Sequence, residues 1–239
     1  MACFVLVHGG AHGGWCWRKL VPLLRADGHD VYAPTLTGFG ERAHLLDDRV
    51  DLDLNVTDIV AVVHYEDLND VILVGHSYAG IVITGVADRI HDRIAQVVYL
   101  DTSVPEQGES IGDIWPAFSA NLRTQSFLVS GVEVISRSED PSGGIYGVQD
   151  PTDLAWMKDR LGSTPWKCVS QPLKLVNPVE VAAIPRTHID TVEGLERLTP
   201  KARERNLLAE RAWQIDTGHD IMITEPHALA EMLLSLVHS

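Results

Sequence analysis

The chain has 239 residues, 45% of them apolar and 22% charged, which is the composition of an ordinary soluble globular domain. Nineteen Lys and Arg against thirty-three Asp and Glu give a formal net charge of −14. This excess of acid argues against a nucleic-acid partner and against an anionic membrane surface, because both require a basic face.

Three cysteines, Cys3, Cys16 and Cys168, are too few for a disulfide framework and favour a reducing compartment. The first apolar run has no basic segment before it, and no run approaches the roughly 20 residues that span a bilayer. We therefore expect a cytoplasmic protein with no signal peptide and no membrane partner.

Short apolar runs alternate with helical patterns along the chain, which predicts parallel strands joined by helical crossovers. Several of these runs are almost wholly apolar, as is typical of strands covered by helices on both faces. The expected strands are Cys3–Val7, Asp30–Ala33, Val71–Val74, Gln96–Leu100, Thr187–Ile189 and Ala212–Ile215. The expected helices are Trp15–Ala26, Asn55–Tyr65, Ala79–Asp88, Pro200–Leu208 and Pro226–His238.

The stretch from Val104 to Val181 breaks this alternation and carries several prolines and tryptophans. A long segment without strand character inside a compact domain often covers a functional site. We interpret residues 104–181 as a mostly helical cap, inserted into a core formed by residues 1–103 and 182–239. A packed excursion with no gating role is the alternative.

The strongest motif is Val-Ile-Leu-Val-Gly-His-Ser-Tyr-Ala-Gly at positions 71–80, an apolar strand that runs through Gly-x-Ser-x-small directly into a helix. In such a nucleophile elbow the serine has a strained backbone, so the neighbouring residues must be small, as Gly75 and Ala79 are. The context predicts Ser77 as a nucleophile, exposed at the tip of a strand and above the start of a helix.

A serine hydroxyl is a weak nucleophile until a base takes its proton. His219 lies in the loop after the last expected strand and before the terminal helix, where this architecture has its base. We therefore predict His219 as the general base that activates Ser77.

The loop after the first strand, His-Gly-Gly-Ala-His-Gly-Gly-Trp at 8–15, is rich in small residues. Such a loop lets backbone amides approach a substrate oxygen, and we expect the amides of Gly10 and Tyr78 to form an oxyanion hole. The glycine spacing fits neither a phosphate-binding loop nor a dinucleotide fingerprint. His8 and His12 have no acidic or thiolate cluster nearby, so we expect no metal and no organic cofactor.

Two carboxylates compete to orient His219. Asp101 ends an apolar strand, Val-Val-Tyr-Leu-Asp at 97–101, where an unpaired charge would be costly. Glu193 follows the penultimate expected strand, on which Asp190 still lies. The sequence favours Asp101, with Glu193 as the alternative acid.

Together these pieces resemble the α/β-hydrolase group of plant methylesterases, the salicylate-binding esterase and the hydroxynitrile lyases, and in particular its bacterial esterase branch. The matching segments are Phe-Val-Leu-Val-His-Gly (4–9), Gly-Trp-Cys-Trp-Arg-Lys-Leu-Val-Pro-Leu-Leu (14–24), Gly-His-Asp-Val (28–31), Val-Ile-Leu-Val-Gly-His-Ser (71–77) and Gly-His-Asp-Ile-Met-Ile-Thr-Glu-Pro (218–226). The resemblance implies an α/β-hydrolase fold, with a mostly parallel sheet, helices on both faces and an inserted helical cap.

The chain departs from this group at two places. The plant esterases carry an aspartate where Gly194 stands here, next to Glu193. The lyase pattern needs a threonine near the oxyanion loop and a lysine directly after the histidine, where this chain has Gly10 and Asp220. No cation is therefore available to stabilise a departing cyanide.

These features predict a serine-dependent carboxylic-ester hydrolase that forms an acyl-enzyme intermediate on a small, hydrophobic ester. The alternatives are a thioesterase or lactonase, a hydroxynitrile-lyase-like enzyme, and a ligand receptor without turnover on the same fold. The sequence leaves open a homodimer.

Overall fold

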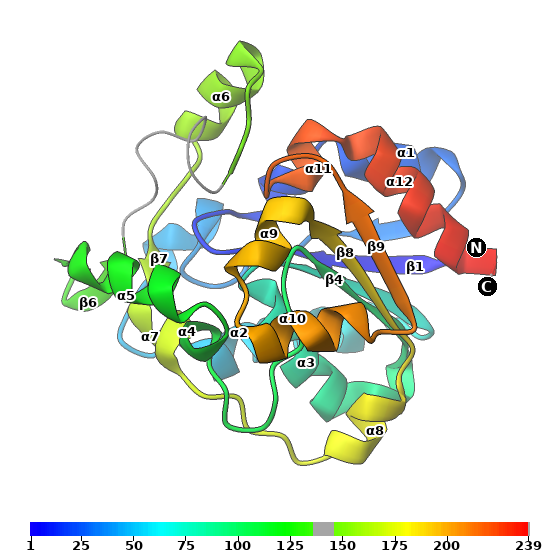
Figure 1. Cartoon of the computed structure of the whole chain (residues 1–239), viewed down its shortest axis with the longest axis horizontal. Coiled ribbons are helices and arrows are strands. Elements are labelled where there is room, and N and C mark those ends of the chain that lie inside the picture. Colours follow the sequence, from blue (N-terminus) through cyan, green and yellow to red (C-terminus); the bar gives the residue numbers. More distant parts are fainter. Residues whose placement is uncertain (136–145, 239) are drawn as a thin grey trace.

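The computed structural model describes residues 1–135 and 146–238 and contains a six-stranded parallel sheet in the order β2-β1-β3-β4-β8-β9. This arrangement confirms the predicted α/β-hydrolase sheet (Figure 1). Its strands are β1 (Cys3–Val7), β2 (Asp30–Tyr32), β3 (Val71–His76), β4 (Ile94–Leu100), β8 (Arg186–Thr191) and β9 (Arg211–Ile215).

Alternate residues of each central strand enter different apolar layers, because successive side chains point to opposite faces of a sheet. In β1, Val5 and Val7 pack in one buried cluster, whereas Phe4 and Leu6 pack in the other. Helices α2 (Leu52–Tyr65) and α3 (Ala79–Ile90) contribute to the first layer, and α1 (Leu20–Ala26) and α12 (Pro226–Ser235) to the second. The sheet is therefore buried on both faces.

The remaining helices are short and lie between the later strands and around the segment that joins β4 to β8. They are α4 (Ile111–Ile114), α5 (Pro116–Thr124), α6 (Pro151–Lys158), α7 (Trp166–Ser170), α8 (Pro178–Ala183), α9 (Val192–Arg197), α10 (Pro200–Leu207) and α11 (Ile221–Thr224). The predicted helix at Trp15–Ala26 is instead a 3-10 turn, Gly14–Trp17, followed by α1. Within the described residues no helix has the length and apolar character needed to cross a membrane.

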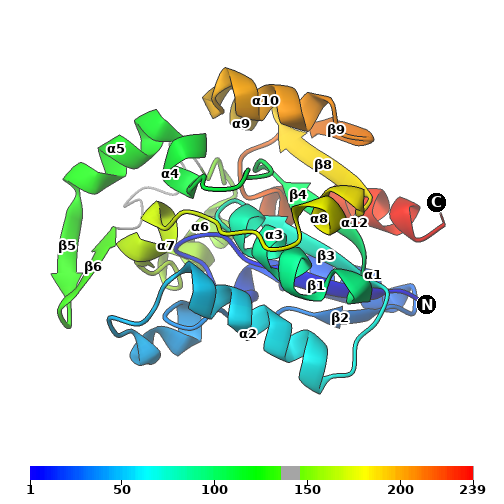
Figure 2. The same ribbon diagram turned by 90° about the horizontal axis from the view of Figure 1, so that it is seen from below.

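The expectation that the inserted segment lacks strands is wrong. It contains a three-stranded antiparallel sheet of β5 (Ser126–Val129), β6 (Val132–Ile135) and β7 (Thr164–Pro165), which lies at the end of the molecule opposite the chain termini (Figure 2). Ser130 and Gly131, both with positive φ (50° and 82°), make the two-residue turn between β5 and β6, the geometry that a hairpin prefers. Residues 136–145 of the predicted cap lie outside the described residues.

Candidate active site

The predicted nucleophile elbow forms as the motif requires. β3 ends at His76, α3 begins at Ala79, and Ser77 between them has a φ of +54°, in the left-handed region that non-glycine residues avoid. The turn allows no side chain at Gly75, because a Cβ there would lie 2.7 Å from the carbonyl oxygen of Ala79. The Ser77 amide donates to the carbonyl of Leu100 at 3.1 Å, so the elbow is tied to the neighbouring strand β4.

His219 lies in the loop before α11 and is buried against Asp101, which follows β4. The Nδ1 of His219 donates to Oδ2 of Asp101 at 2.5 Å. Oδ1 of Asp101 accepts hydrogen bonds from the amide of Thr191 at 2.7 Å and from the Thr191 hydroxyl at 2.9 Å. Asp101 thus has a partner for each oxygen. Among the described residues Nε2 of His219 has no hydrogen-bond partner, and His219 lines the same cavity as Ser77.

Gly194 lies at the start of α9, in direct contact with the Asp101 carboxylate. A Cβ built on Gly194 would lie 2.0 Å from Oδ1 and 2.7 Å from Oδ2 of Asp101, far inside any contact that real Cβ atoms make. The carboxylate of Asp101 therefore occupies the space that a side chain at position 194 would need. The structure therefore has no room for an aspartate at position 194 while the Asp101 carboxylate occupies this place.

The alternative acid, Glu193, points away from this centre. Its side chain is 64% exposed and pairs with Arg197 one turn later in α9. Asp190 lies on β8, as predicted, and accepts hydrogen bonds from the Nδ2 of Asn206 at 3.0 and 3.2 Å. Burial, followed by the nearby charge of Asp101, raises the pKa of Asp190 to about 8. Asp190 is therefore mostly protonated at neutral pH, and its hydrogen-bond partner is Asn206.

The loop from Gly9 to His12 follows β1, and its residues Gly10, Ala11 and His12 line the cavity together with Tyr78. Among the described residues, the amides of Gly10 and Tyr78 donate to no protein acceptor, so both are available to a substrate oxygen. Position 10 must be small as well, because a Cβ there would lie 2.9 Å from the Oγ1 of Thr164.

His8 holds the peptide that carries the Gly10 amide. Its Nδ1 donates to the carbonyl of Gly9 at 2.8 Å, and its Nε2 accepts the amide of Leu36 at 3.0 Å. Burial lowers the pKa of His8 to about 3, so the ring is neutral and keeps one donor and one acceptor. Sequence reasoning considered His8 and His12 only as metal ligands. The described residues contain no group of three or more His, Cys, Asp and Glu side chains that could hold a metal ion.

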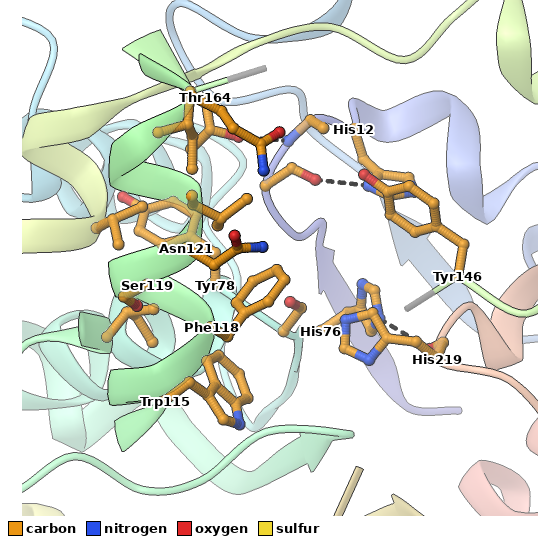
Figure 3. A pocket seen from close by; sticks show the side chains of 18 residues that line it. His12, His76, Tyr78, Trp115, Phe118, Ser119, Asn121, Tyr146, Thr164 and His219 are labelled. Carbon is orange, nitrogen blue, oxygen red and sulfur yellow. Dashed lines mark hydrogen bonds between the residues drawn. The ribbon is translucent and has the colours of Figure 1, made fainter. Parts of the chain in front are cut away.

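The cavity above Ser77 has a volume of about 260 Å³. Side chains of α4, of α5 and of Trp115 between these helices form one wall, which includes Phe118, and His12, Tyr146 and His219 lie across from it (Figure 3). A second cavity of about 30 Å³ lies beside Asp101 and Gly194. Ser77, Trp115, Phe118 and His219 line both cavities, so Ser77 and His219 lie where the large and the small cavity meet.

The fold and this site are those of an α/β-hydrolase, and comparison with known proteins agrees. The model of the Alpha/beta hydrolase family matches residues 4–232, and the chain belongs to this family. It is 36% identical to a carbendazim hydrolyzing esterase of Nocardioides sp. (strain SG-4G), over 99% of this chain and 100% of that protein. It is 27% identical to Methylesterase 1 of Arabidopsis thaliana, over 98% of this chain and 95% of the relative.

Solved structures share the fold over the whole chain. An extracellular alpha/beta-hydrolase from a Paenibacillus species superposes with a TM-score of 0.82 at 24% identity, covering 98% of both chains. Tomato methylketone synthase I superposes with a TM-score of 0.81 at 22% identity, covering 99% of this chain and 98% of that one. The relatives confirm the predicted group and the predicted class, a hydrolase of the carboxylesterase type.

Proposed function

We propose that the protein is a serine esterase in which Ser77, His219 and Asp101 act as nucleophile, base and orienting acid. The observation that carries this proposal is the hydrogen bond of 2.5 Å from His219 to Asp101, beside a serine with a φ of +54° on the same cavity. Asp101 selects the tautomer of His219 with the proton on Nδ1, so the lone pair on Nε2 can accept the hydroxyl proton of Ser77.

The reaction then follows from these positions. Ser77 Oγ attacks the ester carbonyl as His219 takes its proton, and the amides of Gly10 and Tyr78 donate to the developing oxyanion. His219 next protonates the leaving alcohol, and an acyl-enzyme remains on Ser77. Water enters, loses a proton to His219 and attacks the acyl carbonyl, which releases the acid and restores the serine.

The two cavities support an ester with one large hydrophobic part and one small part. The larger cavity, about 260 Å³, is lined mainly by apolar side chains of α4, of α5 and of Trp115 between them, including Ile111 and Leu122. The smaller one, about 30 Å³, has room for a group of about the size of water or a methoxy group. We expect esters of small alcohols, which is in keeping with relatives named as methylesterases.

The inserted segment, residues 104–181, supplies the apolar wall over Ser77, and this supports its proposed role as a cap. A hydroxynitrile lyase of the related type is disfavoured, because Asp220 replaces the required lysine and is itself buried against His12.

The test is turnover of methyl and p-nitrophenyl esters by the wild type and by Ser77→Ala, with fluorophosphonate labelling of both. We expect hydrolysis and a label on Ser77 in the wild type, and a rate loss of about 10⁴–10⁶-fold in Ser77→Ala. His219→Ala should lose a similar factor. A folded wild type that neither turns over esters nor takes the label contradicts the serine mechanism and favours a receptor.

A further inference from the structure

Two buried side chains beside the proposed triad form a pair that the reaction above does not use. His12 is the last residue of the loop Gly9 to His12, which we call the oxyanion loop, and its side chain is 1% exposed. Asp220 directly follows His219 and is 0% exposed. The Nε2 of His12 lies 3.0 Å from Oδ2 of Asp220, and its Nδ1 lies 2.7 Å from the carbonyl oxygen of Gly10. A carbonyl oxygen only accepts, so Nδ1 of His12 donates to Gly10.

The surroundings of His12 favour a proton on both ring nitrogens. Burial disfavours the charged ring, but the charge and hydrogen bond of Asp220, together with the Gly10 carbonyl, outweigh it and raise the pKa of His12. The ring also stacks on Trp15 at 5.2 Å between centroids and 24° between planes, an arrangement that a cation favours.

Three other titratable side chains, His76, Tyr146 and Cys16, lie around the pair. His76 faces His12 at 6.0 Å between ring centroids, and burial lowers the pKa of His76 well below its ordinary value. Tyr146 contacts the ring of His12 edge-on at 5.5 Å. Cys16 is near Asp220, and burial raises the pKa of its thiol well above the usual range. His12 and Asp220 are thus a buried, hydrogen-bonded pair of titratable groups, and a buried pair of this kind is weak evidence for a role in stability.

On one side the pair holds the oxyanion loop. His8 fixes the peptide before Gly10, and His12 fixes the peptide after it, so both torsions of this glycine are restrained. The next residue, Ala11, has a φ of +63°, which a residue with a side chain adopts only when its neighbours enforce it. The amide of Ala11 donates to Thr164 Oγ1 at 2.8 Å, which ties the loop to the inserted segment as well.

The other member of the pair, Asp220, lies in the loop that carries His219. The carbonyl of Asp220 accepts the amides of Ile223 and Thr224 at 2.8 and 3.0 Å and so begins α11. The carbonyl of His219 accepts a hydrogen bond from Nε2 of His76, at 3.0 Å. His219 and Asp220 are therefore connected both to the nucleophile elbow and to the oxyanion loop.

We infer that His12 and Asp220 are positioning residues, which fix the Gly10 amide relative to Ser77 and His219. The inference rests on the proposed serine mechanism. Because an oxyanion forms only as the reaction proceeds, the pair should lower the barrier of acyl transfer and leave substrate binding nearly unchanged. Its loss should therefore appear in kcat and not in KM.

The test compares Asp220→Ala, Asp220→Asn and His12→Phe with the wild type, using a methyl ester for kcat and KM and a fluorophosphonate for the rate of Ser77 phosphonylation. We expect Asp220→Ala and His12→Phe to lower kcat and the phosphonylation rate by about 10–100-fold, with KM within threefold. The kcat and the phosphonylation rate of Asp220→Asn should stay within about fivefold of the wild-type values. The asparagine amide can donate to Nε2 of a neutral His12, while Nδ1 of His12 still donates to the Gly10 carbonyl.

Asp88→Ala is the matched control, since Asp88 is 3% exposed and accepts the amides of Val176 and Asn177 far from the cavity. It should lower the melting temperature and leave kcat unchanged. His12→Phe keeps a ring of similar shape, so it tests the inference even if Asp220→Ala does not fold.

Three results would overturn the inference: a wild-type kcat in folded Asp220→Ala or His12→Phe, a loss confined to KM, or an equal loss in Asp220→Asn and Asp220→Ala. Failure of the wild type itself to take the label on Ser77 would instead remove the serine mechanism.

Discussion

Substitution of Gly194 by alanine tests whether Asp101 orients His219. The added Cβ would lie 2.0 Å from Oδ1 of Asp101, whereas real Cβ contacts do not fall below 3.0 Å, so the carboxylate must retreat by about 1 Å. A retreat of that size lengthens the bond to His219 from 2.5 Å to beyond hydrogen-bonding distance. Loss of the orienting acid costs serine hydrolases about 10⁴-fold, and a 1 Å misplacement about 10²-fold.

We therefore expect Gly194→Ala to lower kcat/KM by about 10²–10⁴-fold, which is about 3–5 kcal/mol of transition-state stabilisation. The helix itself should not suffer, because alanine is a better helix former than glycine by about 1 kcal/mol. The assay is methyl-ester hydrolysis with circular dichroism as the check on folding. Glu193→Ala is the matched control on the same helix, and its activity should equal that of the wild type.

A second variant moves the acid. The double variant Asp101→Gly, Gly194→Asp places the carboxylate at position 194 instead of position 101. We expect its kcat/KM to be at least tenfold higher than that of Asp101→Gly alone. Full activity in folded Gly194→Ala would refute the steric argument. Loss of activity in Glu193→Ala would transfer the role of the acid to Glu193.

Further predictions concern the buried acid, the cavity wall and the elbow. Asp190→Asn should change the pH dependence of stability: the neutral carboxyl is fully stabilising below about pH 4 and loses this contribution as pH rises through its pKa of about 8. Thermal melts should thus show the variant equal to the wild type at pH 4 and more stable by up to a few kcal/mol at pH 9; a constant difference would contradict this. Phe118→Ala should join the two cavities and raise kcat/KM for benzyl over methyl esters by about tenfold, as measured with matched substrates. Gly75→Ala should destabilise the elbow, where the added Cβ would lie 2.7 Å from the Ala79 carbonyl; unchanged melting and activity would refute this.

Much of the fold could be predicted because its signals are local. The apolar runs at β1, β3 and β4 mark strands buried on both faces, and the elbow motif specifies a strand, a turn and a helix in ten residues. Ser77 and His219 stand out as candidates for the same reason, since each follows a strand at a place set by chain order. The hairpin of β5 and β6 was missed although Ser130-Gly131 is a turn signal, because the tryptophans and prolines around it suggested irregular helical structure.

The sequence favoured Asp101 but left Glu193 as the alternative acid, because both follow a core strand and both carry a carboxylate. The distinction depends on direction: Asp101 points to His219, whereas Glu193 points to solvent and to Arg197. Likewise, Gly194 shows its role only when the distance to Asp101 is known.

The amino-acid sequence alone thus determined the class of the protein and its parallel sheet, and it singled out Ser77 and His219 as the candidate nucleophile and base, because these depend on short motifs and on periodicity. Only the tertiary structure decided the partner of His219 and the pairing of His12 with Asp220, whose residues are 118 and 208 positions apart in the chain. Contacts over such separations depend on how strands and loops pack in three dimensions, and no local pattern of residues encodes them.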